Sequence, residues 1–257
     1  MKSGITILYK STMKFSLHKN HKFLILLIYF NRPKQLRRAL QSIREQKHSN
    51  WHVALIDDCS DVPGEEIAKE FLAQEEIDKF TFYRSSDTKE IKNERKKLFA
   101  SMFNIGLDNS GAFISHWFNL AMKENKFDIA LFLCDDDLLH QNYLQNLNVY
   151  YNENVEINYS FSNVILFDER YHNWVDMKDY HNRFFKPFPI NPYFNLDSSQ
   201  VSWRSKCYNV DGIKFNEEYH VNFDADWYKR LFEKYGPCVP NGFISQYKNF
   251  DKDAFHY

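Results

Sequence analysis

The chain has 257 residues, enough to bury the core of one large domain or of two small ones. Its 33 Lys and Arg residues are balanced by 34 Asp and Glu residues, so it lacks the basic excess that is typical of nucleic-acid-binding proteins. Hydrophobic residues make up 44% of the chain and Gly and Pro number only 7 each, which excludes collagen-like, low-complexity and linker-rich architectures.

The first strongly hydrophobic stretch is FLILLIYF at residues 23–30, and the polar residues 1–22 before it are interpreted as an irregular N-terminal extension. Its eight residues are far fewer than the ~20 that a membrane-spanning helix needs. A signal peptide would continue with a cleavage site of small residues, whereas NRPKQ follows here. The sequence therefore predicts a buried parallel strand over 23–29.

Helix and strand patterns alternate along the next hundred residues. Apolar residues at helical spacing predict helices over about 33–46, 65–74 and 112–125. Short apolar runs predict strands over 52–56, 80–84 and 128–134. Residues 85–110 are charged and poorly periodic and are interpreted as a loop or insertion. This alternation predicts a mostly parallel sheet with helices on both faces.

The pattern changes after about residue 155. A strand is predicted over 157–167, and a helix over about 226–235, which Gly236 and Pro237 end. Aromatic residues between and around these elements offer flat apolar faces on which sugars could stack, although core packing accounts for most residues of this kind. They are Trp174, Tyr180, Phe184, Phe185, Tyr193 and Trp203.

The four cysteines, Cys59, Cys134, Cys207 and Cys238, are far apart and form no CxxC pair. Neither a zinc site nor a disulfide framework is indicated, and we expect a reducing, cytoplasmic compartment.

Acidic residues follow two of the predicted strands. Asp57 and Asp58 come after the second strand, and the triplet Asp135–Asp137 comes after the fourth. Parallel strands present their carboxyl ends at one edge of the sheet, where ligands bind. Two carboxylates about 4 Å apart repel by roughly 1 kcal/mol in water and by more when partly buried. A hard divalent cation reverses this repulsion and could bridge to a pyrophosphate. In the alternative interpretation, Asp137 caps the next helix and its neighbours are solvated.

The order of these motifs resembles that of family-2 glycosyltransferases with the GT-A fold. An apolar strand leads into Phe30-Asn31-Arg32, a helix ends with Ser42 to Gln46, and a strand ends in Asp57-Asp58-Cys59-Ser60. FLCDDDLLHQNYL resembles the D-x-D region of that family, and FDADWYKRLFEKYG resembles its acceptor-side helix. The resemblance runs from Phe23 to Gly236. Cys134 stands where many members have the first Asp of D-x-D, and SHWFN at 115–119 replaces a common Ala-Arg-Asn.

The resemblance implies one GT-A-like domain over residues 23–250. Residues 23–140 would be its nucleotide-sugar-binding half and residues 141–250 its acceptor half. The implied reaction is metal-dependent, inverting transfer of a sugar from a nucleoside diphosphate sugar, with UDP as the expected nucleotide, to a hydroxyl of a glycan, lipid-linked or other acceptor. The implied cofactor is Mn²⁺ or Mg²⁺. Peripheral contact with the inner membrane surface is compatible with this class.

The resemblance also implies a nucleotide-sugar site. Phe30 would stack on the base, and Asp57 or Asp58 would accept a hydrogen bond from an N–H of the base. The neighbours Tyr29, Asn31 and Arg32 are assigned to the same site.

On the metal side, the resemblance implies that Asp136 is the principal ligand and Asp137 assists, while Asp135 faces the ribose or the metal. Asp224, six residues before Arg230, would be the general base that removes the acceptor's proton. Asp226 and His220 are rival bases, although Asp226 also suits a helix cap and a single loop histidine is usually solvated.

Three other classes of protein were weighed. A non-catalytic sugar-nucleotide or glycan-binding module would have the same fold and bind donor without turnover. A phosphorelay receiver domain would explain ALIDD at 54–58 but leave the second half of the chain unexplained. A nucleotidyltransferase would usually have a Gly-rich phosphate loop, which this sequence lacks.

Overall fold

The structure is a computed structural model that describes residues 18–85, 90–91, 94, 111–168, 173–174, 188–193, 196–217 and 223–249. Several positions singled out from the sequence lie outside the described residues: most of the 1–22 extension and of the 85–110 insertion, Tyr180, Phe184, Phe185 and His220, and also the side chain of Trp174.

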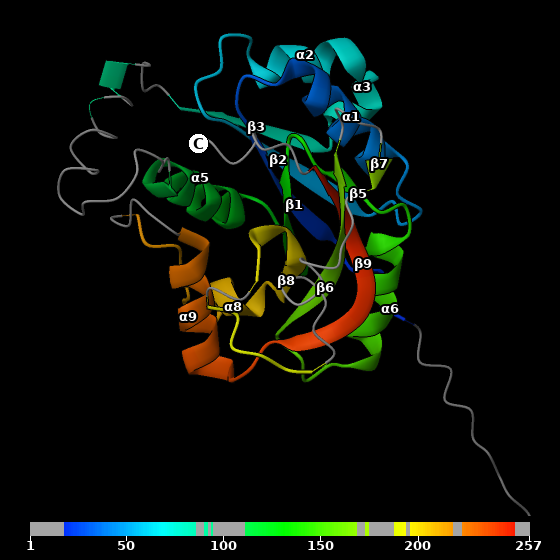
Figure 1. The fold of residues 1–257 in the computed structure, drawn as a ribbon, viewed down its shortest axis with the longest axis vertical. Coiled ribbons are helices and arrows are strands. Elements are labelled where there is room, and N and C mark those ends of the chain that lie inside the picture. Colours follow the sequence, from blue (N-terminus) through cyan, green and yellow to red (C-terminus); the bar gives the residue numbers. More distant parts are fainter. Residues whose placement is uncertain are drawn as a thin grey trace, which may run out of the picture.

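The described strands form one sheet (Figure 1). They are β1 (Phe23–Tyr29), β2 (Trp51–Asp57), β3 (Phe80–Arg84), β4 (Ile129–Cys134), β5 (Leu138–Leu139), β6 (Tyr159–Asp168), β7 (Asn173–Trp174), β8 (Val201–Arg204) and β9 (Val239–Asn249). Their order is β3-β2-β1-β4-β8-β6-β9-β5, and β7 pairs with β6 outside this path. The first four strands of that order are parallel, β8 is antiparallel to both of its neighbours, and β9 runs parallel to β6.

Helices cover both faces of the sheet (Figure 1). They are α1 (Pro33–Arg44), α2 (Gly64–Phe71), α3 (Gln74–Ile77), α5 (Gly111–Glu124), α6 (Tyr143–Glu153), α8 (Lys206–Asn209) and α9 (Phe223–Tyr235), with a short 3₁₀ turn, η1 (Ser198–Gln200). The residues of α1, α2 and α6 share one hydrophobic core, and those of α5, α8 and α9 share the other. The predicted fold class, a mostly parallel sheet with helices on both faces, is confirmed.

Strand β1 shows why an uninterrupted apolar run is needed at the centre of the sheet. Phe23, Ile25 and Leu27 point into the core beneath α1, whereas Leu24 and Leu26 point into the core beneath α5. All five side chains are fully buried. Because successive side chains of a strand face opposite sides, a strand that is covered on both faces must be apolar at every position.

Most elements agree with their predicted ranges, whereas one predicted helix is divided and two helix-cap interpretations are wrong. The helix predicted over 65–74 is divided into α2 and α3, because Leu72 adopts an extended conformation and buries its side chain. Helix α9 begins at Phe223, so Asp226 lies inside its first turn, and the helix-cap interpretation of Asp226 is wrong. The interpretation of Asp137 as a helix cap is also wrong, because β5 follows it and α6 begins only at Tyr143.

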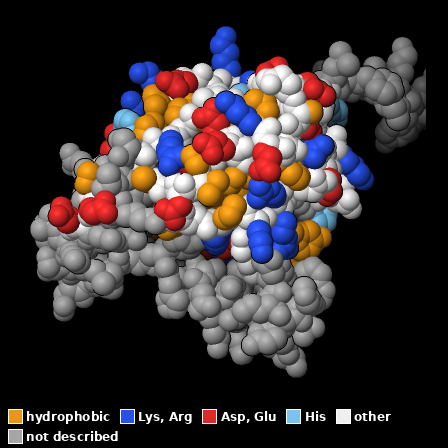
Figure 2. Space-filling model, turned by 90° about the horizontal axis from the view of Figure 1, so that it is seen from above, with side chains coloured by type: hydrophobic (Ala, Val, Ile, Leu, Met, Phe, Trp, Pro, Cys, Tyr) orange, Lys and Arg blue, Asp and Glu red, His pale blue; other side chains and the backbone are white. Residues whose placement is uncertain are grey.

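The outer surface that is seen from above in Figure 2 carries acidic and basic side chains that are intermixed. The helices α1 to α3 also carry ion pairs, which include Arg37–Glu70 at 2.6 Å and Arg44–Glu76 at 2.8 Å. The visible part of this face therefore has no extended patch of a single sign. Within the described residues, no helix has the length and apolar character that crossing a membrane requires.

Candidate functional site

The acidic triplet after β4 is folded into the protein. The backbone N–H of Asp137 donates to the carbonyl of Cys134 at 3.2 Å, which closes a tight turn directly after the strand. Asp135 is only 2% exposed and Asp137 only 1%, while Asp136 is partly exposed. Buried carboxylates need partners, and the triplet obtains them from two distant parts of the chain.

The first set of partners comes from the loop between β1 and α1. The backbone N–H of Phe30 donates to Asp135 Oδ2 at 2.9 Å, and Arg32 Nη2 lies 3.1 Å from Asp135 Oδ1. Arg32 Nη1 donates to Asp136. Burial raises the pKa of Asp135 to about 8, although the nearby charge of Arg32 opposes this shift. The pKa of Asp135 therefore lies well above that of an ordinary Asp, and a further cation at the site would lower it.

The second set comes from the end of β9. Lys248 Nζ lies 3.5 Å from Asp137 Oδ2 and 3.2 Å from Asp197 Oδ1, and the N–H of Asn249 donates to Asp137 Oδ1 at 2.9 Å. Burial raises the pKa of Asp137 to about 7 despite the charge of Lys248. Burial lowers the pKa of Lys248, but the attraction of Asp137 and Asp197 outweighs it, and the net shift is upward. Lys248 is therefore charged.

Asp224 lies at the start of α9 and interacts electrostatically with the same group. Burial and the neighbouring charge of Asp197 raise its pKa to about 6, against the opposing charge of Lys248. Its Oδ1 accepts a hydrogen bond from the N–H of Ala225 at 2.8 Å. The rival Asp226 is engaged in an ion pair with Arg230 at 2.9 Å. Of the two, Asp224 is the one whose pKa responds to the charges of Asp197 and Lys248, which lie beside the acidic triplet.

The acids after β2 have partners within their own loop. Asp57 Oδ1 accepts from the N–H of Ser60 at 2.7 Å, and its Oδ2 accepts from the N–H of Gly64 at 2.9 Å. Arg84 Nη1 lies a further 3.6 Å from Oδ2. Both oxygens of Asp57 thus hold the turn from β2 into α2. Asp58 is also mostly buried, and its N–H donates to the carbonyl of Tyr29 at 3.0 Å.

The remaining predicted nucleotide residues shape the loop between β1 and α1. Tyr29 is fully buried and its hydroxyl donates to the carbonyl of Val62 at 3.1 Å, so its side chain supports the loop from below. Asn31 adopts a left-handed conformation with φ of 51°, which Asn tolerates better than most residues. The N–H of Asn31 donates to Ser60 Oγ at 3.0 Å, which joins the two loops. Phe30 is half-buried beside them.

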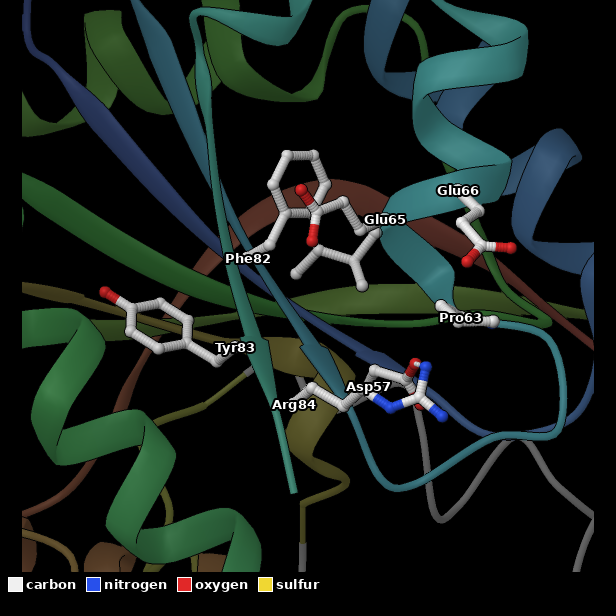
Figure 3. Close-up of a pocket in the computed structure, with 8 residues that line it drawn as sticks. Asp57, Pro63, Glu65, Glu66, Phe82, Tyr83 and Arg84 are labelled. Atoms are coloured by element: carbon white, nitrogen blue, oxygen red, sulfur yellow. Dashed lines mark ion pairs between the residues drawn. The ribbon is translucent and has the colours of Figure 1, made fainter. Parts of the chain in front are cut away.

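A pocket of about 220 Å³ opens beside this pair of loops (Figure 3). Asp57 and Arg84 lie next to each other on one side of it, and Glu65 and Glu66 approach it from the first turn of α2. The acidic triplet does not line it. Two glutamates oppose the binding of phosphates by like charge, so this pocket is not suited to a diphosphate.

The triplet and the preceding cysteine offer a set of possible metal ligands. The Sγ of Cys134 and one carboxylate oxygen each of Asp136 and Asp137 lie within 4.8 Å of one another. Burial raises the pKa of the Cys134 thiol well above its usual value, so the sulfur stays protonated and is a poor ligand. The two carboxylates are the oxygen ligands that Mn²⁺ and Mg²⁺ prefer. Asp136 and Asp137 therefore fit a hard divalent ion.

Sequence reasoning missed Lys248, Asp197 and Arg84. Asp197 begins Asp-Ser-Ser-Gln, and its side chain accepts from Ser199 N at 3.0 Å, so a capping motif was a local signal for it. Arg84 ends a predicted strand and could have been assigned to the same sheet edge. Lys248 is 111 residues from Asp137 and has no local signal. Of the aromatic residues proposed for sugar stacking, Trp203 is fully buried in the core.

Comparison with known proteins supports the resemblance. Residues 24–112 match the family model described as glycosyl transferase family 2. No curated protein sequence matches the chain. The predicted resemblance to family-2 glycosyltransferases is confirmed by the family match together with the fold of its structural neighbours.

Those neighbours are solved glycosyltransferase structures. TarS of S. aureus shares 14% identity with a TM-score of 0.62, over 91% of this chain and 38% of the TarS chain. A shorter TarS structure, in complex with UDP-GlcNAc, matches with 14% identity and a TM-score of 0.62, over 90% of this chain and 59% of that one. The mannosyltransferase PcManGT of Pyrobaculum calidifontis, in complex with GDP-Man and Mn²⁺, shares 10% identity with a TM-score of 0.59, over 92% of this chain and 59% of that one.

The chain thus spans less than two thirds of the length of each of these proteins. Identities this low establish a shared fold, and what the chain does has to be inferred from its own site.

Proposed function

We propose that this chain, a family-2 glycosyltransferase by its match over residues 24–112 and a GT-A protein by its fold, transfers a sugar from a nucleoside diphosphate donor to a hydroxyl acceptor. One observation carries the proposal. Asp137, the candidate metal ligand, and Asp197 both lie within 3.5 Å of Lys248 Nζ, and the charge of Asp197 in turn acts on the candidate base Asp224.

The donor would lie across the loops that follow β1 and β2. Phe30 would stack on the base, and Asp57 or Asp58 would accept a hydrogen bond from it, in addition to the backbone N–H groups that both oxygens of Asp57 already accept. Arg32 would reach the donor from the same loop, next to the carboxylates that it already binds. UDP is our proposed nucleotide, in keeping with the UDP-GlcNAc complex of the TarS neighbour.

Asp136 and Asp137 would hold a divalent ion, for which Mn²⁺ and Mg²⁺ both suit two carboxylate ligands. Such an ion stabilises the negative charge that develops on a departing diphosphate. Asp135, which shares Arg32 with Asp136, would face the ribose or the ion. The PcManGT neighbour, solved with Mn²⁺, supports a metal in this fold.

Asp224 would accept the proton of the attacking hydroxyl. A pKa of about 6 suits this role, because the carboxylate is mostly ionised at neutral pH and is still more basic than an ordinary Asp. With the base and the leaving group on opposite sides of the sugar, we propose that transfer inverts the anomeric centre. Residues 23–140 would then bind the donor and residues 141–250 the acceptor.

The second candidate function is a module that binds sugar nucleotides or glycans without turnover. The raised pKa of Asp224, at the start of α9 and near the charge of Asp197, favours the enzyme, because a binding module does not need a base. Asp224→Asn distinguishes the two functions, and Asp226→Asn is its matched control in the same helix turn.

The experiment measures release of the nucleoside diphosphate and sugar transfer from a panel of UDP- and GDP-sugars, with and without Mn²⁺. We expect Asp224→Asn to bind donor with unchanged affinity and to lose at least about 10²-fold in turnover. Asp226→Asn should retain most of the activity. Wild-type transfer by Asp224→Asn would refute the base, and donor binding without any turnover in the wild type would favour the binding module.

A further inference from the structure

A lysine lies buried among the carboxylates of the proposed site. The side chain of Lys248 is 12% exposed, and its ammonium group is within 3.5 Å of Asp137 and within 3.2 Å of Asp197. A buried ammonium is costly unless it is paired, and Lys248 has two carboxylates for one charge. It supplies positive charge to the same carboxylate that a divalent ion would use.

The backbone holds Lys248 at this position. Strand β9 pairs with β6 on one side, where Lys248 lies opposite Leu166, and with β5 on the other, where Tyr247 lies opposite Leu138. The next residue, Asn249, is tied to Asp137 through its N–H. The ammonium is therefore presented to Asp137 by a paired strand.

A divalent ion on Asp137 would be a close neighbour of this ammonium. Ligand distances of about 2.1 Å place an ion on Asp137 Oδ2 less than about 6 Å from Lys248 Nζ. Two cations at this separation repel each other in a partly buried site. Asp197 offers Lys248 a second partner, so the ammonium has a carboxylate to keep when an ion takes Asp137.

We propose that Lys248 is a resident cation that competes with the divalent ion for Asp137, and so keeps the metal site weak until a diphosphate arrives. This inference rests on the proposed function, since it assumes that the site takes an ion and a nucleoside diphosphate. A diphosphate brings negative charge beside both cations and relieves their repulsion. Metal and nucleotide should then strengthen each other's binding, as linkage requires.

The test measures Mn²⁺ binding to the full chain by titration calorimetry, with and without UDP. The wild type should bind Mn²⁺ weakly alone and at least tenfold more tightly in the presence of UDP. Lys248→Met removes the charge while keeping an unbranched side chain, and we expect it to bind Mn²⁺ alone at least tenfold more tightly than the wild type. The further increase in Mn²⁺ affinity that UDP causes should be smaller in this variant than in the wild type.

Three further variants serve as controls. Lys248→Gln removes the charge but keeps a hydrogen-bond donor for the buried carboxylates. It should also bind Mn²⁺ alone more tightly than the wild type, and it replaces Lys248→Met in the test if that variant does not fold. Lys248→Arg keeps the charge and should keep weak Mn²⁺ binding. Lys234→Met removes an exposed lysine on α9, which is paired with Asp211 at 3.7 Å. This variant should bind Mn²⁺ as the wild type does.

The two proposals fail in different ways. A wild type that binds neither Mn²⁺ nor UDP would contradict the proposed function. If the wild type binds both and the folded charge-removing variants bind Mn²⁺ no more tightly, only the role of Lys248 is refuted. Tight Mn²⁺ binding by Lys248→Arg would also refute it, because charge would then not be the cause.

Discussion

The acids after β2 and the acids after β4 lie at the carboxyl ends of strands in the same parallel sheet, yet they are neutralised in different ways. Asp57 is held by the N–H groups of Ser60 and Gly64, within seven residues along the chain. Asp135 and Asp137 depend on Phe30, Arg32, Lys248 and Asn249, all more than 100 residues away.

We propose that this difference separates an acid that stabilises its own loop, Asp57, from acids that bind a ligand. The N–H groups around Asp57 satisfy both of its oxygens, and no ligand is needed. Among the described residues, the triplet and Asp197 pair with Arg32 and Lys248, which leaves more carboxylates than cations, and burial raises the pKa values of Asp135 and Asp137 despite these two charges. A deficit of positive charge in a buried site is what a divalent ion corrects.

The sharpest way to test this contrast is Asp136→Ala, for which we expect the largest effect. If the triplet serves the ion, turnover should fall by at least about 10³-fold, because the charge of the leaving diphosphate loses its stabilisation. The free energy of unfolding should change little, since Arg32 keeps its ion pair with Asp135 and the loss of one carboxylate relieves the repulsion within the triplet. Nucleotide release and urea denaturation measure the two quantities. Unchanged turnover would remove Asp136 from the site.

The matching change in the other loop, Asp57→Ala, should mainly lower the free energy of unfolding rather than the turnover. It leaves the buried N–H groups of Ser60 and Gly64 without their acceptor, at a cost of about 2–4 kcal/mol in the free energy of unfolding. Urea denaturation of the metal-free chain gives this value directly. A stability loss below about 1 kcal/mol would mean that the loop does not depend on Asp57, and the contrast between the two acidic ends would disappear.

A smaller effect should appear in the pH dependence of stability. The folded-state pKa values of Asp135 (about 8) and Asp137 (about 7) lie above the ordinary value of an Asp. The folded state therefore holds protons that the unfolded state has released, and this contribution to stability is lost as the pH rises through 7 and 8. We expect the melting temperature of the metal-free chain to fall by about 5 °C between pH 6 and pH 9.

Asp135→Asn is the control for this prediction, because its amide does not titrate. Its melting temperature should change less than that of the wild type between pH 7 and pH 9, and Mn²⁺ should flatten the wild-type curve in the same range. Identical pH dependence in Asp135→Asn and the wild type would show that Asp135 is not the group responsible.

Local patterns in the sequence were sufficient for much of the fold. The apolar run at 23–29, Pro33 at the start of α1 and Gly236 after α9 each act within a few residues, through side-chain periodicity and backbone preference. Strand β9 and helix α6 were not predicted. Much of β9 is polar, including Ser245, Gln246 and Lys248, and its place in the sheet comes from pairing with β6 and β5.

The sequence by itself determined the order of strands and helices, the family resemblance and the two acidic strand ends, because each is written in neighbouring residues. Only the tertiary structure decided which acids accept hydrogen bonds within their own loop and which share Lys248, and it brought Asp224 close enough to Asp197 for its charge to raise the pKa of Asp224. Charge balance in a buried site depends on distances between residues that strand pairing brings together. These residues are far apart in the sequence, so local patterns cannot predict the distances.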